Sequence, residues 1–198
     1  MNNKPLLQNR TPGTISLSYP LWRRPAGAGG HERTLTGRKN MFSIREIQPA
    51  DNEHVIALHF AGLRESGSLS SDTSLDVDLY AIADHYPQSR ARFLVAVTME
   101  AGTEKVVGMG AVRKRSESVC EIKRMRVAAG FRREGIAQAI LDQLIAFAQD
   151  IGGVRSIILD TAEAQTAAQR LYEKNGFVLD SRKEIGGIAS LIYKKSLT

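Results

Sequence analysis

The sequence predicts an α/β domain with a mixed, mostly antiparallel central sheet and about four flanking helices. Segments with strand-type alternation and segments with helical periodicity follow one another along residues 41–198, which is typical of this class. Residues 100–105 (EAGTEK) read as a turn between two strand-like runs, so a hairpin is expected there. The first half of the sheet is therefore expected to be antiparallel.

Each element is expected from a local pattern. Residues 49–51 (Pro-Ala-Asp) open a run with helical apolar spacing, as helix starts often do. Ile136, Ile140 and Leu144 mark one apolar helix face, which the glycines at 152–153 bring to an end. The expected order is strand 42–47, helix 49–66, helix 74–86, strands 92–99, 106–115 and 119–127, a helix after 130–135, strand 154–161, helix 165–174, and strands 177–184 and 187–197.

The positive charge of the chain is confined to its first forty residues. The net charge is +6, and residues 1–40 alone hold seven basic residues against one acidic residue. The rest of the chain is balanced. Residues 1–40, rich in Gly, Pro and Arg, are expected to be a disordered basic extension before a domain at 41–198. Nucleic-acid binding is not expected, because it would depend on that extension alone.

The sequence favours a cytoplasmic protein. It has no apolar run long enough for a membrane helix, and its N-terminus lacks the apolar region of a secretory signal. The single cysteine, Cys120, excludes an internal disulfide and is expected to be a small buried residue. Two explanations of residues 1–40 stay open: an extension upstream of a start at Met41, which we prefer, or a targeting segment.

Residues 130–137 (GFRREGIA) combine glycines and arginines at the start of the strongest predicted helix. A helix start presents N–H groups without internal partners, and these bind phosphate well. Gly135 and Ala137 would let a phosphate approach the backbone, and Arg132 and Arg133 would add charge-assisted hydrogen bonds. The sequence therefore predicts a diphosphate cradle.

Two other nucleotide motifs do not fit. The phosphate-binding loop pattern GxxxxGK[ST] and the dinucleotide pattern GxGxxG are both absent. Residues 108–113 (GMGAVR) hold two glycines but run into a strand, so they are interpreted as hairpin packing. His54, His59 and His85 do not have metal-ligand spacing, and no metal site is expected.

With these residues, the sequence resembles the GNAT superfamily of N-acetyltransferases. Arg132-x-x-Gly135-x-Ala137 is similar to the family signature R/Q-x-x-G-x-G/A. Residues 167–177 (AAQRLYEKNGF) are similar to its A-x-x-L-Y-E-K-x-G-F block and follow in the family's order. The resemblance covers about residues 42–195. It implies a sheet whose two middle parallel strands splay apart, and acetyl-CoA as the co-substrate.

The resemblance also implies where acetyl-CoA would lie. Its diphosphate would contact the backbone from Arg132 to Ala137. Its pantetheine arm would lie beside the strand at residues 125–127 and form hydrogen bonds with the backbone there, as an added strand would. Gln165 stands where many family members have an asparagine that contacts the arm. The implied binding residues are Met125, Arg126, Val127, Arg132, Arg133, Glu134, Gly135, Ile136, Ala137 and Gln165.

Two catalytic residues are expected. Tyr172 occupies the family's tyrosine position, and a phenol is suited to protonate a leaving thiolate. Glu121 lies six residues before Val127, where some family members place a general base; a surface glutamate is the alternative. The implied reaction is direct transfer of an acetyl group to a primary amine of a small molecule or protein.

The alternative function is a catalytically silent acyl-CoA-binding module or sensor. Homodimerisation is left open. Residues 66–78 are expected to form part of the acceptor pocket, and their acidic and hydroxyl side chains from Asp72 to Asp78 suggest a cationic acceptor.

Overall fold

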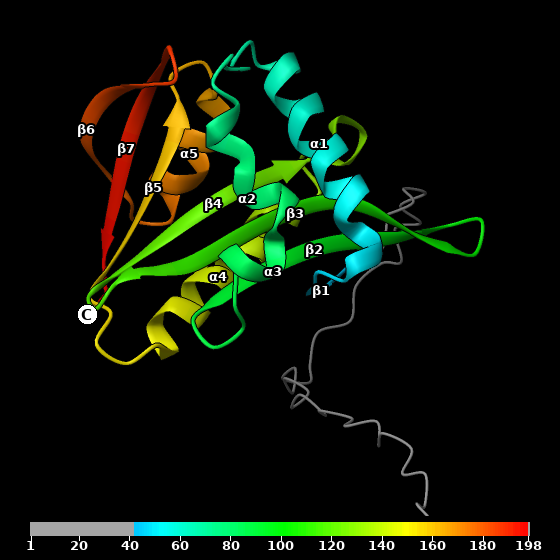
Figure 1. The fold of residues 1–198 in the computed structure, drawn as a ribbon, viewed down its shortest axis with the longest axis horizontal. Helices are drawn as coiled ribbons and strands as arrows, with labels where there is room; N and C mark the ends of the chain where they lie inside the picture. The colour runs from blue at the N-terminus through cyan, green and yellow to red at the C-terminus, as the bar shows by residue number, and fades with distance from the viewer. Residues whose placement is uncertain (1–41, 198) are drawn as a thin grey trace, which may run out of the picture. The chain divides into compact units, whose positions relative to one another are not determined.

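A computed structural model describes residues 42–197, which form one seven-stranded mixed sheet (Figure 1). The spatial order is β1-β2-β3-β4-β5-β7-β6, and only β4 and β5 run parallel. The predicted mixed, mostly antiparallel sheet is therefore confirmed. The extension predicted at 1–40 lies outside the described residues. The strands are β1 (Phe42–Glu46), β2 (Ala91–Glu100), β3 (Thr103–Ser116), β4 (Val119–Val127), β5 (Ser156–Ala162), β6 (Val178–Ile185) and β7 (Ile188–Ser196).

The helices divide between the two faces of the sheet (Figure 1). One buried cluster joins α1, α2 and α3 to β2 and β3, and a second joins α4 and α5 to the opposite face. The helices are α1 (Asn52–Glu65), α2 (Val77–Tyr80), α3 (Ile82–His85), α4 (Ile136–Asp150) and α5 (Thr166–Lys174), with short 3-10 turns at η1 (Pro49–Asp51), η2 (Thr73–Asp76) and η3 (Ala129–Phe131).

The helix predicted at 74–86 is instead broken into η2, α2 and α3. Ala81, between α2 and α3, has φ −139° and ψ 53°, which is outside the helical region. Tertiary contacts hold the bend, because Leu79 and Ile82 are both buried and Asp78 accepts a hydrogen bond from the hydroxyl of Tyr86. Packing against the sheet therefore overrides local helical periodicity here.

Two glycines of β3 set the distance between the sheet and α4. A Cβ at Gly108 would lie 2.7 Å from Cγ2 of Ile136, and one at Gly110 would lie 2.7 Å from Cγ2 of Ile140. These distances are too short for carbon atoms that are not bonded, so the helix packs directly on the strand backbone. The packing role predicted for residues 108–113 is confirmed.

The parallel pair β4 and β5 separates part-way along its length. The two strands pair from Val119 and Ser156 as far as Ile122 and Leu159, and no further. Arg124 then has φ +61°, and the pairing of β3 with β4 shifts register in the same region. The predicted splay of the middle strands is therefore present, and the functional site is built around it.

Candidate active site

A cavity of about 160 Å³ opens where β4 and β5 diverge. Its walls come from α1, the segment between α1 and α2, β4, β5, the start of α5, and the β6–β7 hairpin. Residues 66–78 contribute to this wall, as expected. The polar side chains that line the cavity are His59, Ser68, Ser70, Asp76, Lys123, Arg124, Arg126, Asp160, Thr161, Gln165, Tyr172 and Ser190.

Tyr172 places its phenol between the cavity and the core. It lies on α5, is only 4% exposed, and packs edge-to-face on Phe177 with 5.9 Å between ring centroids. Burial raises the pKa of Tyr172 to about 12, an effect that the positive charge of Arg126 partly opposes. The phenol is therefore fully protonated at neutral pH, as a proton donor must be.

The start of α4 has the backbone conformation of an anion cradle. Gly135, its N-cap, has φ +87°, and Arg133 has φ +66°. As N-cap, Gly135 has no side chain with which to cap the helix, and a Cβ at this position would meet no atom within 4 Å. The first amides of α4 therefore face open space that a phosphate could occupy. The side chain of Ile136 is buried and that of Ala137 is half-buried, and both are apolar. These two residues would therefore contact a phosphate through their backbone N–H groups.

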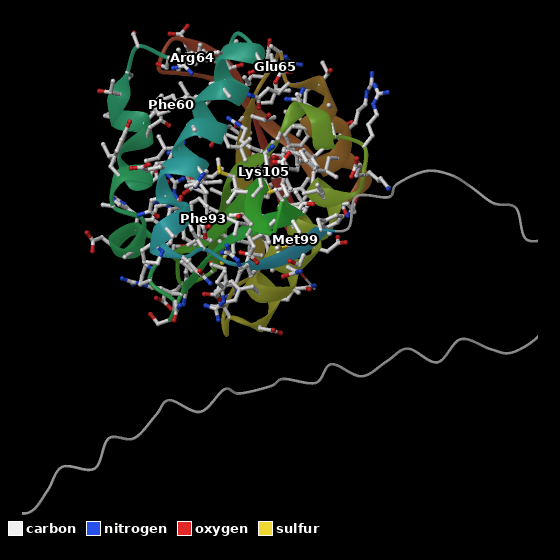
Figure 2. The ribbon with its side chains drawn as sticks, turned by 90° about the vertical axis from the view of Figure 1, so that its right-hand side faces the viewer. Phe60, Arg64, Glu65, Phe93, Met99 and Lys105 are labelled. Carbon is white, nitrogen blue, oxygen red and sulfur yellow. The ribbon has the colours of Figure 1, made fainter. Side chains whose placement is uncertain are left out.

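Arg132 also ties the cradle to α1. Its amino nitrogens lie 2.6 and 2.5 Å from the two carboxylate oxygens of Glu65. Glu65 is the last residue of α1 and is labelled in Figure 2. The pair is about half exposed, so it is worth little to stability. Glu134, in the loop between Arg132 and the helix, is half-buried.

Residues 125–127 leave one backbone edge of β4 without a strand partner among the described residues, because β5 has already diverged. The side chains of Met125 and Val127 pack against the core on the α4 face. Gln165 lies nearby, where it accepts a hydrogen bond from Thr161 (3.0 Å) and donates one to Ser66 (3.2 Å). The unpaired edge of β4 and the Gln165 amide therefore lie at the same opening between β4 and β5.

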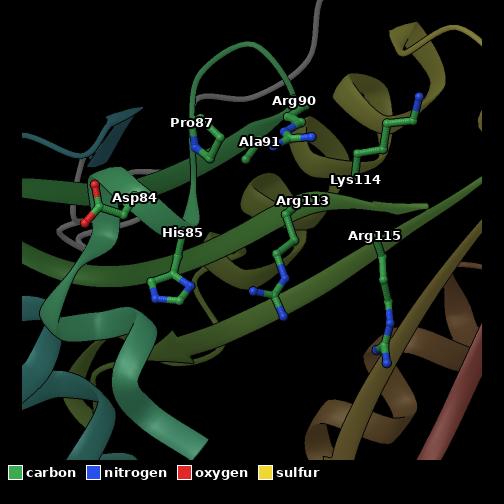
Figure 3. Close-up of a pocket in the computed structure, with 8 residues that line it drawn as sticks. All are labelled: Asp84, His85, Pro87, Arg90, Ala91, Arg113, Lys114 and Arg115. Atoms are coloured by element: carbon green, nitrogen blue, oxygen red, sulfur yellow. The ribbon is translucent and has the colours of Figure 1, made fainter. Parts of the chain in front are cut away.

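Glu121 lies outside this cavity. Arg113 donates two hydrogen bonds to one of its carboxylate oxygens, at 3.0 and 2.8 Å, and Arg115 donates one to the other, at 2.7 Å. Both arginines line a different cavity of about 320 Å³ (Figure 3). Glu121 and Tyr172 are therefore not brought together in one pocket. The arginine partners of Glu121 lie on β3, the strand next to β4. The sequence pattern did not reveal this pairing.

Arg124 organises the buried charges of the site. Its guanidinium donates to Asp76 at 2.6 Å, to the main-chain oxygen of Leu75 at 2.6 Å, and to Asp78. Two of the acidic side chains behind the prediction of a cationic acceptor therefore already contact a cation of the protein, and the charge of the acceptor stays a prediction. Asp76 and Asp78 are already neutralised by an arginine of the protein itself.

Sequence reasoning missed two cavity residues. The sequence excluded His59 as a metal ligand but did not suggest that it lines the site; it is buried, and its Nε2 lies 2.9 Å from Asp76. Burial lowers its pKa to about 4, so the imidazole is neutral at pH 7. The second residue is Asp160. A carboxylate directly after the apolar run 157–159 could have indicated a functional residue at the end of a buried strand. Cys120 is buried and has a raised pKa through burial, as expected for a structural thiol.

Residues 42–197 show two further absences. No helix among them combines the length and apolar character needed to cross a bilayer. They also hold no cluster of three or more His, Cys, Asp or Glu side chains placed to bind a metal ion.

Comparison with known proteins places this geometry in context. The sequence profile described as the Acetyltransferase (GNAT) family matches residues 62–177. The chain is 37% identical over 108 residues to N-acetylaspartate synthetase of Xenopus tropicalis, over 54% of this chain and 38% of that protein. It is 32% identical over 111 residues to N-acetyltransferase 8 of Homo sapiens, over 54% of this chain and 47% of that protein. The chain thus spans less than half the length of these two relatives.

Solved structures agree on the fold. An acetyltransferase of the GNAT family from Staphylococcus aureus superposes with a TM-score of 0.69 at 21% identity, over 80% of this chain and all of the other. Arabidopsis thaliana NAA60 in complex with acetyl-CoA gives a TM-score of 0.62 at 17% identity, over 79% of this chain and 99% of the other. The predicted fold class is confirmed by these neighbours.

Proposed function

Because the chain belongs to the GNAT acetyltransferase family, we propose that it transfers an acetyl group from acetyl-CoA directly to a primary amine. The observation that carries the proposal is one arrangement: Tyr172 faces a cavity at the β4–β5 splay, and an uncapped, glycine-led helix start lies at the end of β4. The first feature suits acyl transfer, and the second suits a diphosphate.

The binding residues are proposed from the fit of this site. Backbone amides from Arg132 to Ala137 would hold the diphosphate, with Arg133 and Glu134 in the loop that shapes the cradle. The free edge of residues 125–127 would take the pantetheine arm as an added strand, and Gln165 would contact it. Acetyl-CoA supplies the activated acetyl group, and the chain supplies position and proton transfer.

The reaction requires two proton movements. The amine attacks the thioester carbonyl, the carbon–sulfur bond breaks, and the departing thiolate takes a proton from Tyr172. The amine must lose its own proton, directly or through water, to a base. Glu121 is the base that the resemblance implies, but both its oxygens accept hydrogen bonds from arginines. Asp160 lines the cavity and has no ion pair within the described part of the chain, so the geometry favours Asp160.

A panel of amines with acetyl-CoA, followed by release of free thiol, tests the proposal on the full chain. Amine-dependent thiol release with formation of the acetylated amine is expected. Tight binding of acetyl-CoA without transfer to any amine would instead support the alternative, a catalytically silent acyl-CoA-binding module. A cytoplasmic location and a homodimer stay predictions, and gel filtration with light scattering checks the second.

A further inference from the structure

Arg126 is a half-buried cation that forms no ion pair within residues 42–197, although the charges of Asp160 and Asp76 act on it. Its side chain donates one hydrogen bond, from Nη1 to the main-chain oxygen of Met125 at 2.7 Å. Its Nε is buried and has no hydrogen-bond partner in this part of the chain. Burial of the charge lowers the pKa of Arg126. A buried guanidinium with free donors is costly to maintain unless an anion binds to it.

Close packing on α1 fixes the position of the Arg126 side chain. A Cβ on Gly62 of α1 would lie 2.9 Å from Cδ of Arg126 and 3.2 Å from its Nε, so the side chain of Arg126 packs closely on the backbone of α1 at this glycine. Arg124, two residues earlier, lines the same cavity, but its donors are occupied by Asp76, Asp78 and Leu75. Arg126 is therefore the arginine in this cavity that is available to a ligand.

The cavity also holds a carboxylate that forms no direct ion pair within residues 42–197. Asp160, on β5, is exposed, and its charge acts on both Arg126 and Tyr172. A cation and a carboxylate that attract each other without direct ion pairing thus lie on the walls of one small cavity, near the proposed proton donor. An acceptor that carries both an amine and a carboxylate matches this pair of charges.

We propose that the acceptor is a carboxylate-bearing amine, such as a free amino acid, and that the Arg126 guanidinium binds its carboxylate. This inference rests on the proposed acetyltransferase function and narrows its substrate class. The amine then points towards Asp160 and the splay, where the acetyl group is transferred. Arg126 acts here as a residue that determines specificity.

The experiment compares matched acceptors on the full chain with acetyl-CoA. Each amino acid is assayed beside its α-amide and its decarboxylated amine, and kcat and KM are measured separately. We expect the free carboxylate to be preferred by about 100-fold in kcat/KM, the size expected for a buried charge-assisted pair. In Arg126→Met the preference should fall to a few-fold, mainly through a higher KM for the amino acid. Arg126→Lys should retain part of it.

Two further measurements make the result decisive. The proposed contact of Arg126 with the pantetheine arm is made by its backbone, so acetyl-CoA affinity should be retained in Arg126→Met. Retained affinity shows that the variant is folded and that the loss concerns the acceptor. Lys123→Met removes the other cation of the same wall that forms no ion pair with described residues, and it should keep the preference. Amides or decarboxylated amines acetylated as well as amino acids would overturn the inference and leave the acetyltransferase function intact. Transfer to no amine at all would overturn both.

Discussion

Tyr172 illustrates how much of the chemistry depends on a single buried side chain. Its pKa of about 12 keeps the phenol protonated throughout the neutral range. Tyr172→Phe removes the proton but keeps the ring that packs on Phe177. We expect kcat to fall about 100-fold or more, with little change in acetyl-CoA affinity, because general acids contribute about this much.

The matched control is Tyr193→Phe. The Tyr193 ring lies 6.2 Å from that of Tyr172, its hydroxyl donates to Glu173 at 2.9 Å, and Tyr193 is not among the residues that line the cavity. This variant should keep its kcat. Equal losses in the two variants would mean that packing, not proton donation, explains the effect.

The two carboxylates proposed as base can be separated by their pH dependence. Asp160→Asn should lower kcat/KM strongly and change its dependence on pH, because the group that accepts the proton of the amine is lost. Glu121→Gln should lower stability by breaking its ion pairs with Arg113 and Arg115, while the profile keeps its shape. The reverse pattern, measured with the same acceptor, would assign the role to Glu121.

At the scale of elements, the start of α4 allows the proposed diphosphate site to be tested by one substitution. Gly135 has φ +87° and open space at its Cβ position, so Gly135→Val has a backbone cost of about 1–2 kcal/mol but no clash within the described protein. The added side chain would occupy the place of the diphosphate. We expect acetyl-CoA affinity, measured by calorimetry, to fall below detection while the variant stays folded.

Gly102 provides the control, since the β2–β3 turn that contains it lies away from the cradle. Its φ is +83°, and a Cβ there also meets nothing within 4 Å. Gly102→Val therefore has the same backbone strain without touching the proposed site. If both variants lost cofactor binding to the same degree, strain rather than obstruction would be the cause.

Elements with strong local signals were predictable, and those shaped by distant contacts were not. The helix at Ile136–Asp150 and the β2–β3 hairpin follow from periodicity and turn residues. The segment 74–86 was predicted as one helix, because the contacts with the sheet and with Tyr86 that bend it cannot be read from local periodicity. Glu121 was placed correctly on a strand, but its arginine partners come from a neighbouring strand.

On the scale of the whole molecule, a buried charge network joins parts of the chain that are far apart in sequence. His59 on α1, Asp76 in η2 and Asp78 on α2 all contact Arg124 on β4. The sequence suggested Tyr172 and the cradle because motifs are local. It could not suggest this network, or the free charge of Arg126, because both depend on which side chains meet after folding.

The same network makes the stability of the molecule sensitive to acid. The pKa of His59 is about 4 in the folded protein and about 6.5 in an unfolded chain, so only the unfolded state gains a proton between these values. The contribution of His59 to the free energy of unfolding is therefore fully present above pH 6.5. It is lost as the pH drops towards 4, by about 3 kcal/mol in all. Asp78, with a pKa lowered to about 2 mainly by its hydrogen bond from Arg124 against the opposing effect of burial, extends the loss below pH 4.

Chemical denaturation of the wild type, His59→Gln and His54→Gln from pH 7 to pH 4 measures this effect. His59→Gln removes the titrating ring, so its free energy of unfolding should change less across the range, although it starts lower at pH 7. His54 is exposed on the same helix, and His54→Gln should follow the wild type. Parallel curves for all three proteins would show that acid acts elsewhere. The buried arginine network would then not be what couples α1 and α2 to the sheet in a pH-dependent way.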